Sequence, residues 1–156
     1  MSRKLAAAAA TVLAACVAGG CGGDDKGSSD DDKPVTKATF ITSADAICTK
    51  TDAEITAAAA KLREKSEKDG TLPKQDVVNF FKGTSLPAYN DLVRQLGALT
   101  PPKGDEAKID GLLATLASAI DTVKADPEKF ASTAAEDPFA DFNTRAKAYG
   151  MKVCGS

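Results

Sequence analysis

Apolar residues recur at three- and four-residue steps between residue 42 and the C-terminus, which is the period of an amphipathic helix. The first such stretch begins at Thr42 or Ser43, where Thr42 and Asp45 have capping-box spacing, and it ends at Asp69-Gly70. We therefore predict a long first helix with one buried stripe. The stripe consists of Ala44, Ile47, Cys48, Ile55, Ala58, Ala59 and Leu62.

The second stretch runs from near Thr71 to Thr100-Pro101-Pro102 and is interrupted in the middle. Gly83-Thr84-Ser85 and Pro87 break the apolar stripe, which then resumes in phase. This pattern predicts either one kinked helix or two stacked helices. The stripe consists of Val77, Val78, Phe80, Phe81, Leu92, Val93, Leu96 and Leu99.

A third helix is predicted between Asp105, as N-cap, and Asp126-Pro127, where Asp126 is expected to cap a short helix through Phe130. Its buried positions are Ile109, Leu112, Leu113, Leu116, Ala119, Ile120 and Val123.

The last helix is expected to use Asp137 as its cap and Pro138 as its first residue, and to stop at Gly150. Its inner face is Phe139, Phe142, Ala146 and Tyr149.

No stretch alternates apolar and polar residues for long enough to indicate a strand. The sequence thus predicts an all-α, up-down four-helix bundle over residues 38–156, with the second helix kinked or split.

In such a bundle the chain start and the chain end meet at the same end of the structure. Cys48 in the first helix and Cys154 just past the last helix are then expected to form a disulfide. A thiolate metal site or reactive pair is disfavoured, because no C-x-x-C spacing or further ligands accompany them.

The N-terminus has the features of a lipoprotein export signal, assigned to residues 1–20. Arg3 and Lys4 precede an apolar run that is shorter than the roughly 20 residues of a membrane span. Cys16 follows the better lipobox, Leu13-Ala14-Ala15, whereas lipidation of Cys21 leaves an even number of cysteines in the mature chain. We favour Cys21, with Cys16 and an unlipidated signal as the alternatives.

Residues 21–37 then form a predicted tether, rich in Gly, Ser and Asp and without apolar periodicity. As a flexible coil it would span about 20–25 Å. The aspartate run Asp30-Asp31-Asp32 does not have the spacing of an EF-hand loop, so we expect a solvated spacer and no metal site.

Composition narrows the classes of function. The chain has 20 basic and 22 acidic residues, no histidine and no tryptophan. The mixed surface charge argues against nucleic acid as a partner, and the lack of histidine removes the usual general base and zinc ligand. The carboxylate pairs Glu106/Asp110 and Glu64/Glu67 have helical spacing but no matching second pair. We expect no catalytic residues and no cofactor.

Six aromatic residues are candidates for lining an apolar ligand cavity between the helices, and ordinary core packing is the alternative. The break between Gly83 and Pro87 is where such a cavity forms most easily. The candidates are Phe80, Phe81, Tyr89, Phe139, Phe142 and Tyr149.

Three short segments carry a resemblance to a group of proteins. They are Ala44-Asp45-Ala46-Ile47-Cys48, Leu99-Thr100-Pro101-Pro102, and Ala148-Tyr149-Gly150 with Cys154. In these the chain resembles uncharacterised small helical lipoproteins of high-GC Gram-positive (actinobacterial) cell envelopes. The resemblance implies a cell-envelope location and a bundle fold, and it implies no activity.

We therefore expect a lipid-anchored module on the outer face of the cytoplasmic membrane that binds a protein or another envelope component without chemistry of its own. The alternative is a carrier of a small apolar or amphiphilic ligand within the bundle. A close-packed interior would favour the first. An apolar cavity of about 300 Å³ or more would favour the second.

Overall fold

The computed structural model describes residues 34–131 and 136–156, and these residues are helical with no strand. Lys33–Ser156 forms one compact unit. No helix within the described ranges is long and apolar enough to cross a membrane. The predicted all-α class is confirmed. The predicted signal peptide, the lipidation candidates Cys16 and Cys21 and the tether up to Lys33 lie outside the described residues.

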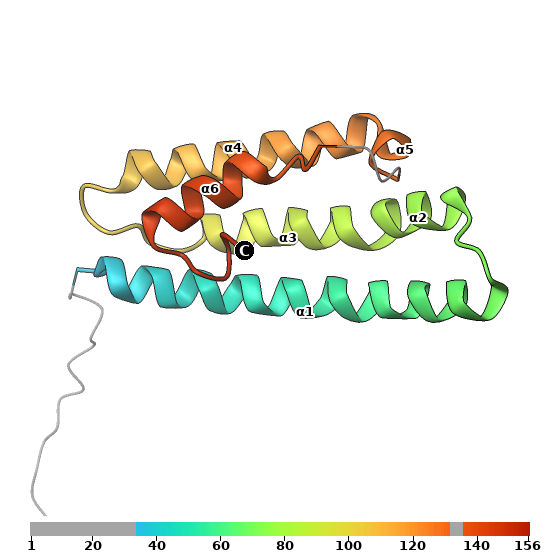
Figure 1. Cartoon of the computed structure of the whole chain (residues 1–156). Coiled ribbons are helices and arrows are strands. Elements are labelled where there is room, and N and C mark those ends of the chain that lie inside the picture. Colours follow the sequence, from blue (N-terminus) through green and yellow to red (C-terminus); the bar gives the residue numbers. More distant parts are fainter. Residues whose placement is uncertain (1–33, 132–135) are drawn as a thin grey trace, which may run out of the picture. The chain divides into compact units, whose positions relative to one another are not determined.

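Helix α1 spans Lys37–Asp69 and begins one to two turns earlier than the sequence suggested (Figure 1). Its cap is Thr36, whose hydroxyl accepts the Thr39 N–H at 3.1 Å. The expected start at Thr42 is wrong, because the Thr42 hydroxyl donates to the Ala38 carbonyl inside the helix. The earlier start adds Phe40, only 2% exposed, to the buried face. Lys37, assigned above to the tether, is the first residue of the helix.

The second helical stretch is continuous but changes its winding. Helix α2 spans Lys74–Phe80, the π-helical turn η2 spans Phe81–Ser85, and helix α3 spans Leu86–Gly97. A proline ring clashes with the carbonyl four residues earlier in an α-helix. In the widened turn, the Leu86 N–H donates to the Phe81 carbonyl, five residues back, directly before Pro87. The π-turn therefore explains the break in the sequence pattern.

Helix α4 spans Glu106–Ala125, and the short helix α5 spans Pro127–Phe130. Asp105 occupies the N-cap position of α4 as predicted, but its side chain makes no cap hydrogen bond. The Asp126 carboxylate caps α5 by accepting the Lys129 N–H at 3.0 Å, as predicted.

Helix α6 spans Ala140–Tyr149 and ends at Gly150, whose φ of 113° suits glycine. It begins two residues after Pro138, so the predicted start is early. The Asp137 carboxylate instead accepts the Phe139 N–H at 2.9 Å in a turn that leads into the helix.

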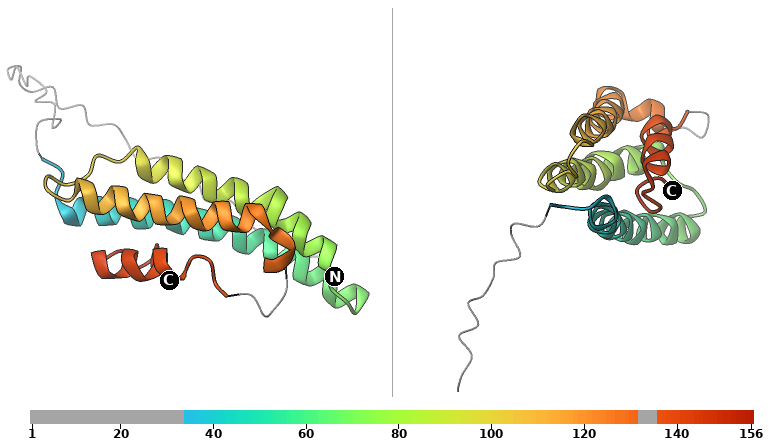
Figure 2. Two further views of the ribbon diagram at one scale, coloured as in Figure 1. Left: turned by 90° about the horizontal axis from the view of Figure 1, so that it is seen from above. Right: turned by 90° about the vertical axis from the view of Figure 1, so that its left-hand side faces the viewer.

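Helix α3 packs against both α1 and α4, and α4 also packs against α6 (Figures 1 and 2). The buried residues where these helices meet form one apolar core. The core comprises Phe40, Ala44, Cys48, Leu86, Leu92, Leu96, Ile109, Leu112, Leu116, Ile120, Val123, Phe142, Ala146, Tyr149, Met151 and Cys154.

The chain segment after α6 is fastened to α1. The predicted Cys48–Cys154 disulfide is present, with Cα atoms 5.2 Å apart. One turn before Cys48, the Asp45 carboxylate accepts the backbone N–H groups of Lys152, Val153 and Cys154 at 3.0, 2.9 and 3.2 Å. Asp45 therefore serves the C-terminal segment and is not part of a cap on α1.

Candidate functional site

Four of the six aromatic candidates line one groove at the π-turn, which we call the aromatic groove. Phe80, Phe81, Tyr89 and Phe139 surround a space of about 300 Å³ that opens to the surface. This is the break where the sequence suggested a cavity. The groove is completed by Ile55, Ser85, Val123, Phe130, Glu136, Asp137 and Pro138.

The groove lies between the α2–η2–α3 stretch and the turn that leads into α6. The rings of Phe80 and Phe81 are 5.9 Å apart and tilted by 59°. Tyr89 lies two turns beyond Phe81, and its ring stacks on Phe139 with centroids 4.5 Å apart. Such offset and tilted arrangements are the favourable geometries for aromatic pairs.

Four of the residues that line this space carry polar groups, namely Ser85, Tyr89, Glu136 and Asp137. Ser85 is only 3% exposed. Burial raises the pKa of the Tyr89 phenol, with smaller contributions from the charges of Asp52 and Asp137. A mostly apolar lining with a few polar groups is typical of small-molecule sites.

The structure places the other two aromatic candidates, Phe142 and Tyr149, outside the aromatic groove. Both face inward from α6 and are 4% and 7% exposed. Phe142 packs in the core, and Tyr149 meets Phe40 edge to face, with ring centroids 6.1 Å apart. Helical spacing alone does not distinguish them from the aromatic residues that line the groove.

Two spaces adjoin Phe142. One measures about 10 Å³, close to the volume that one water molecule needs. The other measures about 190 Å³ and lies beside the disulfide, with Tyr89 and Phe139 also in its lining. The aromatic groove at the π-turn, at about 300 Å³, is larger than either. The residues around the small core space are Phe40, Leu96, Ile109, Leu112, Leu113, Phe142 and Met151.

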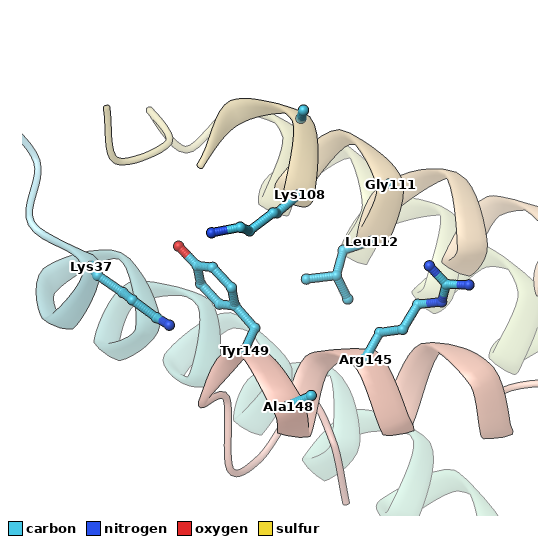
Figure 3. A pocket seen from close by; sticks show the side chains of 8 residues that line it. Lys37, Lys108, Gly111, Leu112, Arg145, Ala148 and Tyr149 are labelled. Atoms are coloured by element: carbon cyan, nitrogen blue, oxygen red, sulfur yellow. The ribbon is translucent and has the colours of Figure 1, made fainter. Parts of the chain in front are cut away.

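A second hollow, of about 400 Å³, lies among α1, α4 and α6 (Figure 3), and we call it the basic hollow. Lys37, Lys108 and Arg145 surround it, one from each helix. Sequence analysis missed it because each cation alone resembles ordinary surface charge. Its remaining lining residues are Ala107, Gly111, Leu112, Ala148 and Tyr149.

The Tyr149 hydroxyl at this hollow donates to Asp105 at 2.9 Å. Burial, together with this bond to a carboxylate, raises the pKa of Tyr149 to about 12. Lys108, whose ammonium lies 2.6 Å from Asp105, and the Tyr149 hydroxyl lower the pKa of the Asp105 carboxyl. This neutral phenol and ionised carboxyl together link α6 to the start of α4.

The carboxylates that sequence analysis considered serve local roles or face solvent. Glu106 accepts the Gly104 N–H at 2.7 Å, while Asp110, Glu64 and Glu67 are exposed. Within residues 34–131 and 136–156, no group of three or more Cys, Asp or Glu side chains is arranged to hold a metal ion. What the aromatic groove offers is apolar contact surface, which is suited to binding.

Comparison with known proteins assigns neither a family nor an activity. No protein-family model, no curated protein and no solved structure matches this chain.

Proposed function

We propose that this chain is a non-catalytic binding module, anchored to the outer face of the cytoplasmic membrane, that holds a small apolar or amphiphilic ligand in the aromatic groove. The observation that carries the proposal is the convergence of Phe80, Phe81, Tyr89 and Phe139 around about 300 Å³ at the π-turn. π-turns inside α-helices frequently occur at functional sites. The lipoprotein signal predicted from the N-terminal sequence supports the anchoring, with Cys21 favoured over Cys16.

The size and chemistry of the groove support a small ligand. Ligand pockets commonly have volumes of about 300–1,000 Å³ and are lined mainly by apolar and aromatic side chains. The buried Ser85 hydroxyl provides one hydrogen-bonding group for orientation. Because the groove opens to the surface, a ligand can enter without separating the core helices.

The same surface opening supports the second candidate function, binding of an envelope protein through an apolar side chain. The space among Phe40, Leu96 and Met151 measures only about 10 Å³, and such close packing in that part of the core supports an interaction module. We also infer that α1, the α2–η2–α3 stretch, α4 and α6 form an up-down four-helix bundle. The packing of α1 on α3, of α3 on α4 and of α4 on α6 supports this arrangement.

Photolabelling of the full-length protein tests the groove directly. A long-chain alkyl diazirine is added to the protein in mild detergent, and the labelled residues are mapped by mass spectrometry. We expect saturable labelling concentrated on the groove residues, reduced several-fold by Phe81→Ala or Phe80→Ala. The control Leu113→Ala removes a partly buried side chain elsewhere. Labelling spread evenly over the surface, or equally lowered by the control, would contradict the proposal.

A further inference from the structure

The basic hollow combines cationic side chains with an apolar floor, which consists of Leu112 and the ring of Tyr149 (Figure 3). Its cations come from three helices: Lys37 from the first turn of α1, Lys108 from α4 and Arg145 from α6. Leu112 and the ring of Tyr149 lie between them. None of the described residues that line the hollow is acidic.

The three cations are held in place without being fully neutralised. Lys108 pairs with Asp105 at 2.6 Å, and Arg145 Nε lies 3.0 Å from both carboxylate oxygens of Asp141. The Lys37 ammonium lies 4.2 Å from the centroid of the Tyr149 ring and pairs with no carboxylate among the described residues. Among the described residues, the three cations thus have two carboxylate partners, and neither carboxylate lines the hollow.

A glycine keeps the floor open. Gly111 lies one turn after Lys108 in the interior of α4, where glycine is less favourable than alanine. A Cβ atom added there would meet nothing within 4 Å. A larger residue can therefore be accommodated by the helix, and its side chain would occupy space in the hollow.

We propose that the basic hollow binds the anionic headgroup of a membrane phospholipid. The phosphate lies among the cations, and the adjoining apolar carbons rest on Leu112 and Tyr149. An apolar floor gives no advantage for free phosphate, whereas it matches the boundary between headgroup and acyl chain. The hollow also includes Lys37 in the first turn of α1, 16 positions after Cys21, the favoured lipidation residue.

This site is separate from the aromatic groove, with which it shares no lining residue. Its occupant is a lipid of the membrane to which the chain is proposed to be anchored. Bound there, the lipid would hold the helical unit against the membrane surface by attraction between Lys or Arg side chains and anionic headgroups.

Titration calorimetry on the full-length protein in non-ionic detergent tests this proposal. The probes are dihexanoylphosphatidylglycerol, dihexanoylphosphatidylcholine and inorganic phosphate, each with a detergent-only blank. We expect saturable binding of one phosphatidylglycerol, with affinity at least about tenfold above that of either other probe. Equal binding of phosphatidylcholine, or equal binding of inorganic phosphate, would overturn the proposal.

Variants separate this site from general surface charge. Lys37→Gln and Arg145→Gln are each expected to weaken phosphatidylglycerol binding several-fold. Lys147→Gln, which removes an exposed cation on α6 outside the hollow, is expected to leave it unchanged. An equal loss in Lys147→Gln would show that binding is non-specific.

Gly111→Leu tests the floor without removing charge. It is expected to abolish phosphatidylglycerol binding while the melting temperature is kept or raised, because the change favours the helix. Ser118→Leu places the same side chain at an exposed α4 position outside the hollow and is expected to bind normally. Full binding by a folded Gly111→Leu protein would overturn the proposal.

Discussion

The carboxylate of Asp45 accepts the backbone N–H of Val153 at 2.9 Å, although the two residues lie 108 positions apart in the chain. The same carboxylate accepts the N–H groups of Lys152 and Cys154, and the disulfide joins α1 to the segment one turn further on. A charged acceptor and a covalent bond thus hold the C-terminal segment on α1.

Removal of the Asp45 acceptor is expected to destabilise the fold. Asp45→Ala leaves three backbone N–H groups without their partner, and we predict a loss of about 1–3 kcal/mol in the free energy of unfolding. Chemical denaturation followed by circular dichroism measures this loss. Glu54→Ala, at an exposed position of α1, should change the stability by less than about 0.5 kcal/mol. Equal effects of the two substitutions would show that the Asp45 bonds contribute nothing.

Reduction of the Cys48–Cys154 disulfide is also expected to destabilise the fold. The bond closes a loop with a sequence separation of 106 residues. The chain-entropy estimate for a loop of that length is about 4–5 kcal/mol, which corresponds to a fall in Tm on the order of 10–20 °C. Calorimetry with and without reductant measures the shift. The double variant Cys48→Ser/Cys154→Ser should melt at the lower temperature and not respond to reductant.

The link between Tyr149 and Asp105 predicts an unusually late tyrosine ionisation. The chain has two tyrosines and no tryptophan, so absorbance at alkaline pH reports them cleanly. We expect Tyr149 to ionise with a pKa of about 12, above the ordinary value of about 10. Asp105→Asn should lower this pKa, and Tyr149→Phe should remove the transition. A titration of wild type with both tyrosines near 10 would contradict the assignment.

The same pair predicts how stability depends on pH. The pKa of Tyr149 is raised in the folded state, so its contribution is fully present below about pH 10 and is lost as pH rises through about 12. The pKa of Asp105 is lowered, so its contribution is present above about pH 4 and is lost as pH falls further. Denaturation curves of wild type and Asp105→Asn should therefore converge in acid. Curves that stay parallel down to low pH would contradict this linkage.

Two glycines are expected to respond oppositely to alanine. Gly111→Ala should raise stability by about 0.5–1 kcal/mol, because the new Cβ meets open space in a helix interior. Gly155→Ala should lower stability, because its Cβ would lie 2.8 Å from the Lys147 backbone nitrogen and 2.9 Å from the Asn143 carbonyl. Thermal melts measure the direction in which each variant changes the melting temperature. A rise in the melting temperature of both variants would contradict the packing described for Gly155.

Local patterns in the sequence were sufficient to predict the all-α class and several helix ends. The helical periodicity, the Asp126 cap and the Gly150 stop depend on neighbouring residues, and the sequence analysis identified them correctly. The start of α1 was misplaced because Thr42 and Asp45 have the spacing of a capping box. The carboxylate of Asp45 instead bonds to backbone more than a hundred residues away, which local pattern cannot reveal.

The candidate site could be predicted only in part, for the same reason. The break between Gly83 and Pro87 marked the π-turn where the aromatic groove lies. Helical spacing could not separate Phe81, which lines the groove, from Phe142, which packs in the core. Whether an aromatic side chain lines the groove depends on its neighbours from α1, α5 and the turn before α6, which are distant in the sequence.

Native mass spectrometry of the full-length protein, extracted from its own membrane in mild detergent, determines whether the aromatic groove holds a ligand. We expect a reproducible bound small mass that is lost on denaturation and is absent from Phe81→Ala, while Leu113→Ala retains it. The same spectrum distinguishes acylation at Cys21 from acylation at Cys16. A bare lipoprotein mass, or a spectrum in which Phe81→Ala loses none of the bound masses, would contradict ligand binding in the aromatic groove.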